Sequence, residues 1–181
     1  KAYYKDWTPY PVHTNHYRKD VEHIEVEHFY ATSKDGLEIP FYAVCLGGLK
    51  NAVNRPTWMN IYGGYGTELT PSKDPYSLDF ILKGGVFILP NIRGSGGYSR
   101  SWEEQGRGKN KGNAIKDIAS VAKFLQENGH SNPEKFVISG GSHGGLIVSS
   151  AGVKYPELFS VVIATAVPLD LLSLENYSTG S

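Results

Sequence analysis

The first patterned part of the chain alternates apolar and polar residues, and fully apolar runs follow farther on. The alternating positions are Ile24, Val26, His28 and Tyr30. The sequence Lys34-Asp35-Gly36 favours a chain reversal, and residues 41–46 return as a second run. Residues 21–46 are therefore predicted to form an antiparallel hairpin.

Beyond residue 56, short apolar runs alternate with segments that have helical spacing. The runs are residues 57–62, 86–92, the stretch that ends at Gly140, and 159–167, and each is predicted to be a buried strand. The helical segments are residues 75–85, 113–129 and 145–156. Fully apolar strands that alternate with helices are typical of a parallel sheet covered on both faces. The sequence therefore predicts an α/β fold.

Two parts of the chain differ in character. Residues 1–20 are rich in tyrosine, proline and charge and show no period, which indicates an irregular lead-in or a linker. Residues 21–181 carry the strand and helix patterns and are predicted to form one domain.

Composition excludes several classes of partner. The 18 basic and 18 acidic residues cancel, which argues against nucleic acid. No run approaches the roughly 18 apolar residues of a membrane span, so we expect no membrane partner. The single cysteine, Cys45, favours a reducing compartment, and we expect a cytoplasmic protein. The sequence contains no metal-ligand cluster, heme motif or nucleotide-binding loop, so no metal and no cofactor are expected.

The stretch VISGGSHGGLIV, residues 137–148, places one hydroxyl between four glycines. Gly140, Ser142 and Gly144 fit the G-x-S-x-G nucleophile elbow. A nucleophilic serine stands on a tight, strained turn between a strand and a helix, and side chains two residues before and after it would collide with that turn. An apolar strand is predicted before the motif and a helix after it. This context favours the elbow over an ordinary glycine-rich loop.

A second glycine cluster, IYGGYG at residues 61–66, also follows a predicted strand. Hydrolases with a nucleophile elbow place their second oxyanion donor at such a position. A tight turn at the end of the strand, with Tyr62 simply packed, would explain the same residues. The cluster leaves both interpretations open.

Taken in order, the motifs IYGGYG, NIRGSGGY (91–98) and GGSHGG resemble the catalytic domain of the prolyl oligopeptidase family of serine peptidases. SKDGLEIP (33–40) and the segment around Trp102 are also similar to that family. The resemblance covers residues 21–170 and implies an α/β-hydrolase fold, truncated before its final strands.

The resemblance also implies roles for individual residues. Ser142 would be the nucleophile, and the oxyanion hole would be formed by the Tyr62 hydroxyl and the backbone N–H of His143. Tyr65 matches a position near the substrate pocket. Arg93 and Asp117 match positions that we interpret as a structural ion pair. Prolyl-specific members usually carry asparagine where this chain has His143, so the chain departs from the prolyl-specific pattern at this position.

A base and an orienting carboxylate for the serine are missing from the expected place. In this fold the order is Ser, then Asp or Glu, then His, but His143 is the only histidine from Ser142 onward. Its side chain, next to the serine, would point elsewhere. Asp170 comes too early for the family's carboxylate and is interpreted as a loop or pocket residue. The other histidines are interpreted as exposed: His13, His16, His23, His28 and His130.

We therefore expect a fragment of a serine peptidase that lacks the triad Asp and His. The parent protein would cleave short peptides, in particular after proline, through an acyl-enzyme. A β-propeller that gates the site is expected in the rest of the parent chain. The alternatives are a peptidase similar to acylaminoacyl peptidase or oligopeptidase B, a carboxylesterase, and a non-catalytic module with a hydrolase fold.

Overall fold

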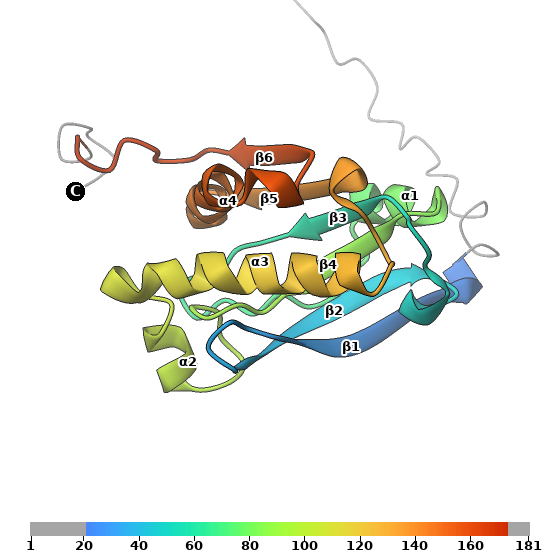
Figure 1. Cartoon of the computed structure of the whole chain (residues 1–181), viewed down its shortest axis with the longest axis horizontal. Helices are drawn as coiled ribbons and strands as arrows, with labels where there is room; N and C mark the ends of the chain where they lie inside the picture. Colours follow the sequence, from blue (N-terminus) through green and yellow to red (C-terminus); the bar gives the residue numbers. More distant parts are fainter. Residues whose placement is uncertain (1–20, 174–181) are drawn as a thin grey trace, which may run out of the picture.

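A twisted six-stranded sheet forms the centre of the protein, with strand order β1-β2-β4-β3-β5-β6 (Figure 1). The computed structural model describes residues 21–173. The strands are β1 (Ile24–Thr32), β2 (Glu38–Leu46), β3 (Thr57–Asn60), β4 (Val86–Pro90), β5 (Phe136–Gly141) and β6 (Val161–Thr165). β3 pairs in parallel with β4 and β5, and β5 with β6, as the fully apolar runs predicted. The α/β fold is thus confirmed.

The predicted hairpin is present as β1 and β2, which pair antiparallel from Ile24 opposite Leu46 to Thr32 opposite Glu38. Its turn is closed by the Gly36 amide, which donates to the Ser33 carbonyl. The alternating face is, however, the outer one: Val26, His28 and Tyr30 are exposed, whereas Ala31 is buried. β1 is an edge strand with helical cover on one side only. The face that contains Ala31, which does not carry the alternating apolar residues, therefore makes the core contacts.

Helices cover both faces of the sheet. They are α1 (Pro75–Leu82), α2 (Arg100–Glu104), α3 (Lys111–Glu127) and α4 (His143–Lys154), with short 3-10 turns at Val21–His23, Leu49–Asn51, Gly108–Asn110, Pro133–Lys135 and Pro156–Leu158. α3 and α4 pack on one face in the main core, which includes Phe41, Ile88 and Ile138. α1 closes a smaller cluster on the other face through Ile81. Within the described residues, no helix is long and apolar enough to cross a bilayer.

Element ends differ from the predicted ones by a few residues. β3 ends at Asn60 rather than residue 62, and β4 ends at Pro90 rather than residue 92. In both cases an isoleucine just beyond the strand, Ile61 or Ile92, is buried in the following loop, so the apolar run extends past the end of the strand. α4 begins at His143, two residues before the predicted start.

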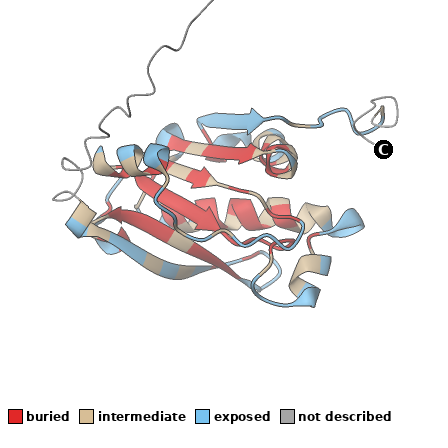
Figure 2. Ribbon diagram, turned by 180° about the vertical axis from the view of Figure 1, so that it is seen from behind, coloured by how far each residue is buried: buried red, intermediate tan, exposed pale blue. Residues whose placement is uncertain are grey.

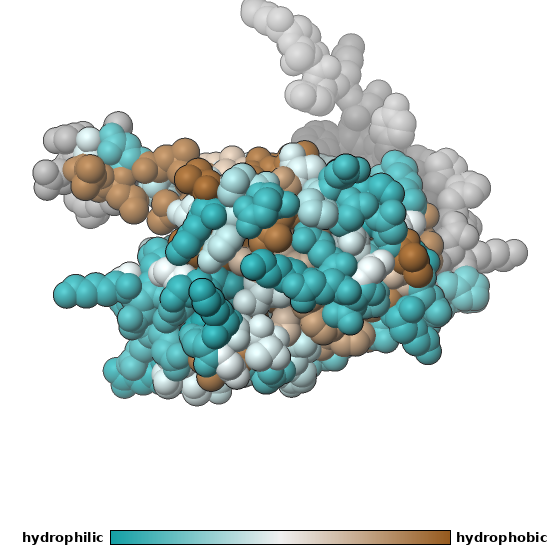
Figure 3. Space-filling model, in the orientation of Figure 1, coloured by the Kyte–Doolittle hydropathy of each residue, from teal (hydrophilic) through white to brown (hydrophobic). Residues whose placement is uncertain are grey.

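The prediction that residues 159–167 form a buried strand is wrong about burial. β6 covers Val161–Thr165 and all five residues are exposed (Figure 2). β6 is an edge strand that pairs only with β5, and no described element packs outside it. Apolar side chains therefore gather over β6 and the segment that follows it (Figure 3). They are Val161, Val162, Ile163, Leu169, Leu171 and Leu172.

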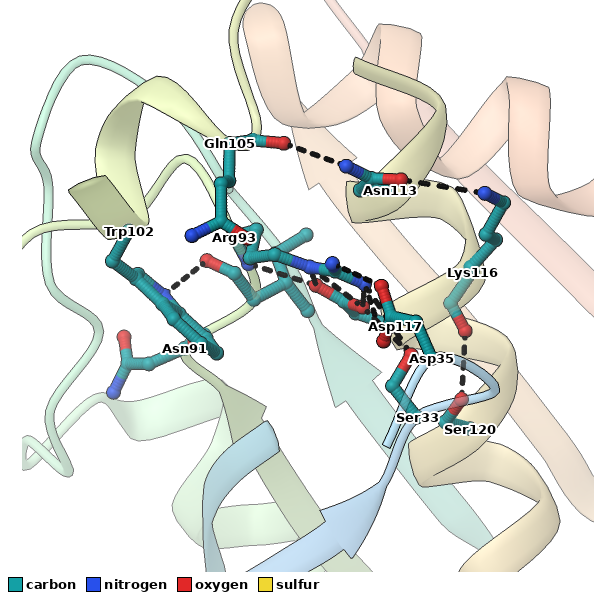
Figure 4. A network of polar contacts seen from close by, with 11 residues as sticks. Ser33, Asp35, Asn91, Arg93, Trp102, Gln105, Asn113, Lys116, Asp117 and Ser120 are labelled. Atoms are coloured by element: carbon teal, nitrogen blue, oxygen red, sulfur yellow. Dashed lines mark hydrogen bonds and ion pairs between the residues drawn. The ribbon is translucent and has the colours of Figure 1, made fainter. Parts of the chain in front are cut away.

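A buried arginine joins three elements of the fold. The Arg93 side chain, after β4, is 1% exposed, and its Nη2 lies 2.5 Å from Oδ1 of Asp117 on α3 (Figure 4). Its Nη1 lies 2.5 Å from Oδ2 of Asp35 in the hairpin turn, and its Nη2 donates to Oγ of Ser33 at 3.3 Å. The expected Arg93–Asp117 ion pair is confirmed, and Asp35 is an additional partner that the sequence did not indicate.

The same loop is fixed by two further side chains. Trp102 on α2 donates from Nε1 to the carbonyls of Asn91 and Ile92 (Figure 4). The Asn91 amide exchanges two hydrogen bonds with the backbone of Leu69. The loop after β4 is therefore bound to α2, α3, the hairpin and the loop after β3 at once.

Several sequence interpretations lie outside the described residues. These are the lead-in at residues 1–20, with its two histidines His13 and His16, and everything from residue 174 onward.

Replacement of Asp117 by Asn should destabilise the protein by about 3–5 kcal/mol, because a buried guanidinium would lose its main counter-charge. The measurement is urea unfolding followed by circular dichroism. Glu104→Gln is the control, since it breaks the exposed Arg100–Glu104 pair and should cost about 0.5 kcal/mol or less. Equal losses in the two variants would contradict the structural role of the Arg93–Asp117 pair.

Asp35 should add an acid-sensitive contribution to stability. The hydrogen bond from Arg93 lowers the pKa of Asp35 below its ordinary value of 3.8. A lowered carboxyl pKa stabilises the fold above the ordinary value, and this stabilisation is lost as pH falls through the folded value. Unfolding free energies measured between pH 5 and 2 should therefore fall less steeply in Asp35→Asn. An unchanged slope of unfolding free energy against pH would show that protonation of Asp35 does not affect stability in this range.

Candidate active site

Ser142 stands on a strained turn between β5 and α4. Its backbone angles are φ 51° and ψ −117°, a conformation that costs a non-glycine residue about 1–3 kcal/mol. Its amide donates to the carbonyl of Thr165 on β6 at 2.9 Å, which anchors the turn to the sheet. The residue is exposed, and its side chain does not cap α4. The hydroxyl is therefore presented at the surface rather than used to stabilise the helix.

The two elbow glycines are required by close backbone packing. A Cβ on Gly140 would collide with the backbone of Gly144, and a Cβ on Gly144 would collide with the carbonyl of Ile61. The turn is thus pressed against the end of β3 as well as against itself. The motif explains the two glycines by the tight turn alone, and the structure adds close packing against the residue that follows β3.

The first turn of α4 faces the same region as the serine. The helix begins at His143, and the first N–H groups of any helix have no acceptor within it. They also lie at the positive end of the helix dipole. The backbone N–H of His143 is therefore in a chemically suitable place to stabilise negative charge that develops near Ser142.

The His143 side chain is engaged away from the serine. Its Nε2 lies 3.2 Å from the carbonyl oxygen of Gly63, and its Nδ1 lies 3.5 Å from Nζ of Lys111. Because the carbonyl can only accept and the ammonium can only donate, the proton belongs on Nε2 and Nδ1 is the acceptor. Burial, and then the positive charge of Lys111, lower the pKa of His143, while the Gly63 carbonyl raises it. Neither nitrogen contacts Ser142, so the ring is a poor candidate for its base.

The loop after β3 surrounds this imidazole. The ring centroids of Tyr62 and Tyr65 lie 6.0 and 5.5 Å from that of His143. Gly64 makes room for the ring, since a Cβ there would overlap the imidazole. Tyr62 is half-buried, whereas Tyr65 is 82% exposed. The second glycine cluster and the elbow, 80 residues apart in sequence, therefore meet at one place.

A cleft of about 340 Å³ opens beside His143. Sequence reasoning missed three of its charged residues: Glu103, Arg107 and Lys111. They belong to the glycine-rich, basic stretch GRGKNKGN and the helix before it, whose composition was the available signal. The remaining lining residues are Gly64, Tyr65, Gly94, Gly106 and His143.

The other candidate groups lie elsewhere. His23 and His28 are exposed, as interpreted from the sequence. His130 is not: it is half-buried and its Nδ1 lies 3.0 Å from the carbonyl oxygen of Ala52. Asp170 lies in an exposed loop and accepts from the amide of Ser173 at 3.1 Å. In residues 21–173 no group of three or more His, Cys, Asp or Glu side chains could hold a metal ion.

A sequence model described as the prolyl oligopeptidase family matches residues 74–179, which include the elbow, Arg93 and Asp117. This chain belongs to the prolyl oligopeptidase family. It is 32% identical over 155 residues to a prolyl endopeptidase of Elizabethkingia meningoseptica, an alignment that covers 86% of this chain and 22% of that protein. The chain spans about a fifth of the length of the curated relatives it matches.

Solved structures of the family have the same arrangement of strands and helices. A post-proline cleaving enzyme from Rickettsia typhi superposes with a TM-score of 0.82 at 32% identity, covering 88% of this chain and 23% of that one. Oligopeptidase B from Trypanosoma brucei superposes with a TM-score of 0.74 at 28% identity, covering 79% and 20%. The six-stranded unit is thus part of the family's α/β-hydrolase domain.

The lysine next to the imidazole provides a test of this geometry. NMR titration of the protein should give His143 a pKa below the ordinary 6.5, and Lys111→Met should move it upward, because one positive charge is removed. Lys109→Met, which removes an exposed charge that does not line the cleft, is the matched control. A pKa that is the same in both variants would place Lys111 outside the environment of the ring.

Proposed function

We propose that the parent protein is a serine peptidase that hydrolyses short peptides through an acyl-enzyme on Ser142. The observation that carries the proposal is the exposed, strained serine at the junction of β5 and α4, with glycines on both sides packed against the end of β3. Such a backbone conformation costs free energy, and strained residues of this kind cluster at active sites. Membership of a serine peptidase family supports the same chemistry.

In the reaction, Ser142 Oγ attacks the peptide carbonyl carbon and its proton passes to a base. The backbone N–H of His143 and the Tyr62 hydroxyl donate to the resulting oxyanion. Collapse of this intermediate breaks the C–N bond, the base returns the proton to the leaving amine, and water then releases the acid from the ester. The contact of Tyr62 with the ring next to Ser142 supports its place in the oxyanion hole.

The base and its carboxylate are proposed to come from parts of the parent outside this sequence. The Ser, Asp, His order of the fold supports this assignment, as does the engagement of both nitrogens of His143. A gating β-propeller in the same parent is proposed on the ground that the relatives are several times longer than this chain.

Cleavage after proline is the preferred specificity. It is supported by the relatives named prolyl endopeptidase and post-proline cleaving enzyme. His143, the residue after Ser142, lines the cleft, so the side chain that differs from the usual asparagine is in a position to modify this preference.

A cytoplasmic location is proposed because the sequence contains one cysteine, Cys45. This thiol is fully buried, and burial raises its pKa to about 11, so it is protected from oxidation wherever the protein resides. The support for the compartment is therefore the scarcity of cysteine rather than the state of this one.

The full-length protein should react with a fluorophosphonate probe, and Ser142→Ala should abolish the labelling. In the same protein Tyr62→Phe should lower kcat for a proline-containing peptide by roughly 10²–10³, because one oxyanion donor is lost. Tyr76→Phe, an exposed tyrosine on α1, is the matched control and should leave kcat unchanged.

Labelling that persists in Ser142→Ala would rule out Ser142 as the nucleophile. Loss of labelling combined with an unaffected kcat in Tyr62→Phe would keep the nucleophile and reject the oxyanion role of Tyr62. Cleavage of esters but not of peptides would show that the parent protein is a carboxylesterase rather than a peptidase.

A further inference from the structure

The cleft beside His143 holds charged side chains that have no ion-pair partner among residues 21–173. Lys111, Arg107 and Glu103 all line it, and the salt bridges of the described residues involve none of them. Lys111 and Glu103 are half-buried, whereas Arg107 is exposed. Unpaired charges that are partly removed from water gain more from a charged ligand than fully solvated ones do.

Lys111 is the most incompletely satisfied of the three. Its Nζ has one hydrogen-bonding contact, the long 3.5 Å approach to Nδ1 of His143, although an ammonium carries three donors. Burial lowers the pKa of this amine, in keeping with an ammonium short of acceptors. No described residue accepts from its remaining donors, and Lys111 lines the cleft.

The cleft is held open by backbone rather than by adjustable side chains. A Cβ on Gly106 would collide with the backbone of Arg93, and a Cβ on Gly94 with the carbonyl of Gly63. The segment between α2 and α3 is also tied down, because Asn113 donates to the Gln105 carbonyl at 3.1 Å (Figure 4). A ligand would therefore meet a fixed wall in a cleft that both Lys111 and Glu103 line.

The sum of the charges decides which ligand the cleft accepts. Lys111 and Arg107 contribute two positive charges and Glu103 one negative charge, and His143 is neutral above its lowered pKa. The net positive charge favours an anion close to Lys111, and Glu103 opposes it. His143, which lines the cleft, directly follows Ser142 in the chain, and its ring centroid lies 5.5 Å from that of Tyr65.

We propose that this cleft is a subsite for a carboxylate side chain of the peptide substrate, with Lys111 as its counter-charge and Glu103 as an opposing charge. The inference rests on the proposed peptidase function, because the acidic residue would be brought to the cleft by a peptide held at Ser142. The substrates of the parent would then be short peptides with an aspartate or glutamate near the cleaved bond.

The test is a series of peptides cleaved at one bond by the full-length protein, with Glu or Gln placed in turn at each position around that bond. At one position the kcat/KM ratio of the Glu to the Gln peptide should be about ten, the effect of one charge-assisted hydrogen bond. Lys111→Gln should reduce this ratio to about one, and Glu103→Gln should raise it several-fold. Lys109→Gln, outside the cleft, should leave it unchanged.

Opposite effects of the two cleft variants distinguish charge recognition from a structural disturbance, which would change both ratios in one direction. A ratio near one at every position, or a preference for Glu that survives in Lys111→Gln, would overturn the inference and leave the peptidase function intact.

A binding experiment separates the inference from the proposed function. N-acetylglutamate amide is titrated into the Ser142→Ala protein, and the His143 ring resonances are followed by NMR. Lys111-dependent shifts, absent with N-acetylglutamine amide, would support the subsite even if no peptide were cleaved. Absence of shifts in a protein that cleaves peptides would count against the subsite alone.

Discussion

One buried guanidinium fixes the positions from which the candidate site is built. Arg93 has almost no contact with water and its charge is met by Asp117 on α3 and Asp35 in the hairpin turn. A buried charge without such partners would be strongly unfavourable, so the three elements are obliged to meet at this point. α3 begins with Lys111, and the loop that carries Arg93 continues into Gly94. Lys111 and Gly94 both line the cleft. The shape of the cleft thus depends on an ion pair that takes no part in chemistry.

Close packing of backbone against backbone is the second constraint. Gly140 and Gly144 bring the elbow against the end of β3, and Gly94 brings the loop after β4 against the backbone of Gly63 in the loop after β3. At these points even one methyl group would require the chain to move. The glycine-rich motifs, far apart in sequence, are therefore parts of one packing arrangement. The exposed hydroxyl of Ser142 and the ring of His143 are held by that arrangement rather than by hydrogen bonds from their own side chains to each other.

The outer edge of the sheet has a different character from its centre. β3, β4 and β5 are largely buried, whereas β6 presents Val161, Val162 and Ile163 to solvent (Figure 2). An exposed apolar edge strand has unpaired backbone groups that can bind a further strand. The family relatives are several times longer than this chain, and the family model matches this chain through β6 to residue 179. The serine is anchored to this edge, since its amide donates to Thr165.

The sequence by itself determined the features that depend on local pattern. The period of the apolar residues gave the hairpin and the alternating strands and helices, and the glycines around Ser142 gave the elbow, because turn geometry excludes side chains at fixed spacings. Tertiary structure alone decided the rest. It placed Asp35 beside Arg93, set the His143 ring between Gly63 and Lys111, and assembled the charged cleft from Glu103, Arg107 and Lys111. It also left β6 exposed, although its apolar sequence resembles that of a buried strand. These outcomes depend on which distant segments pack together, and no local pattern of residues encodes that.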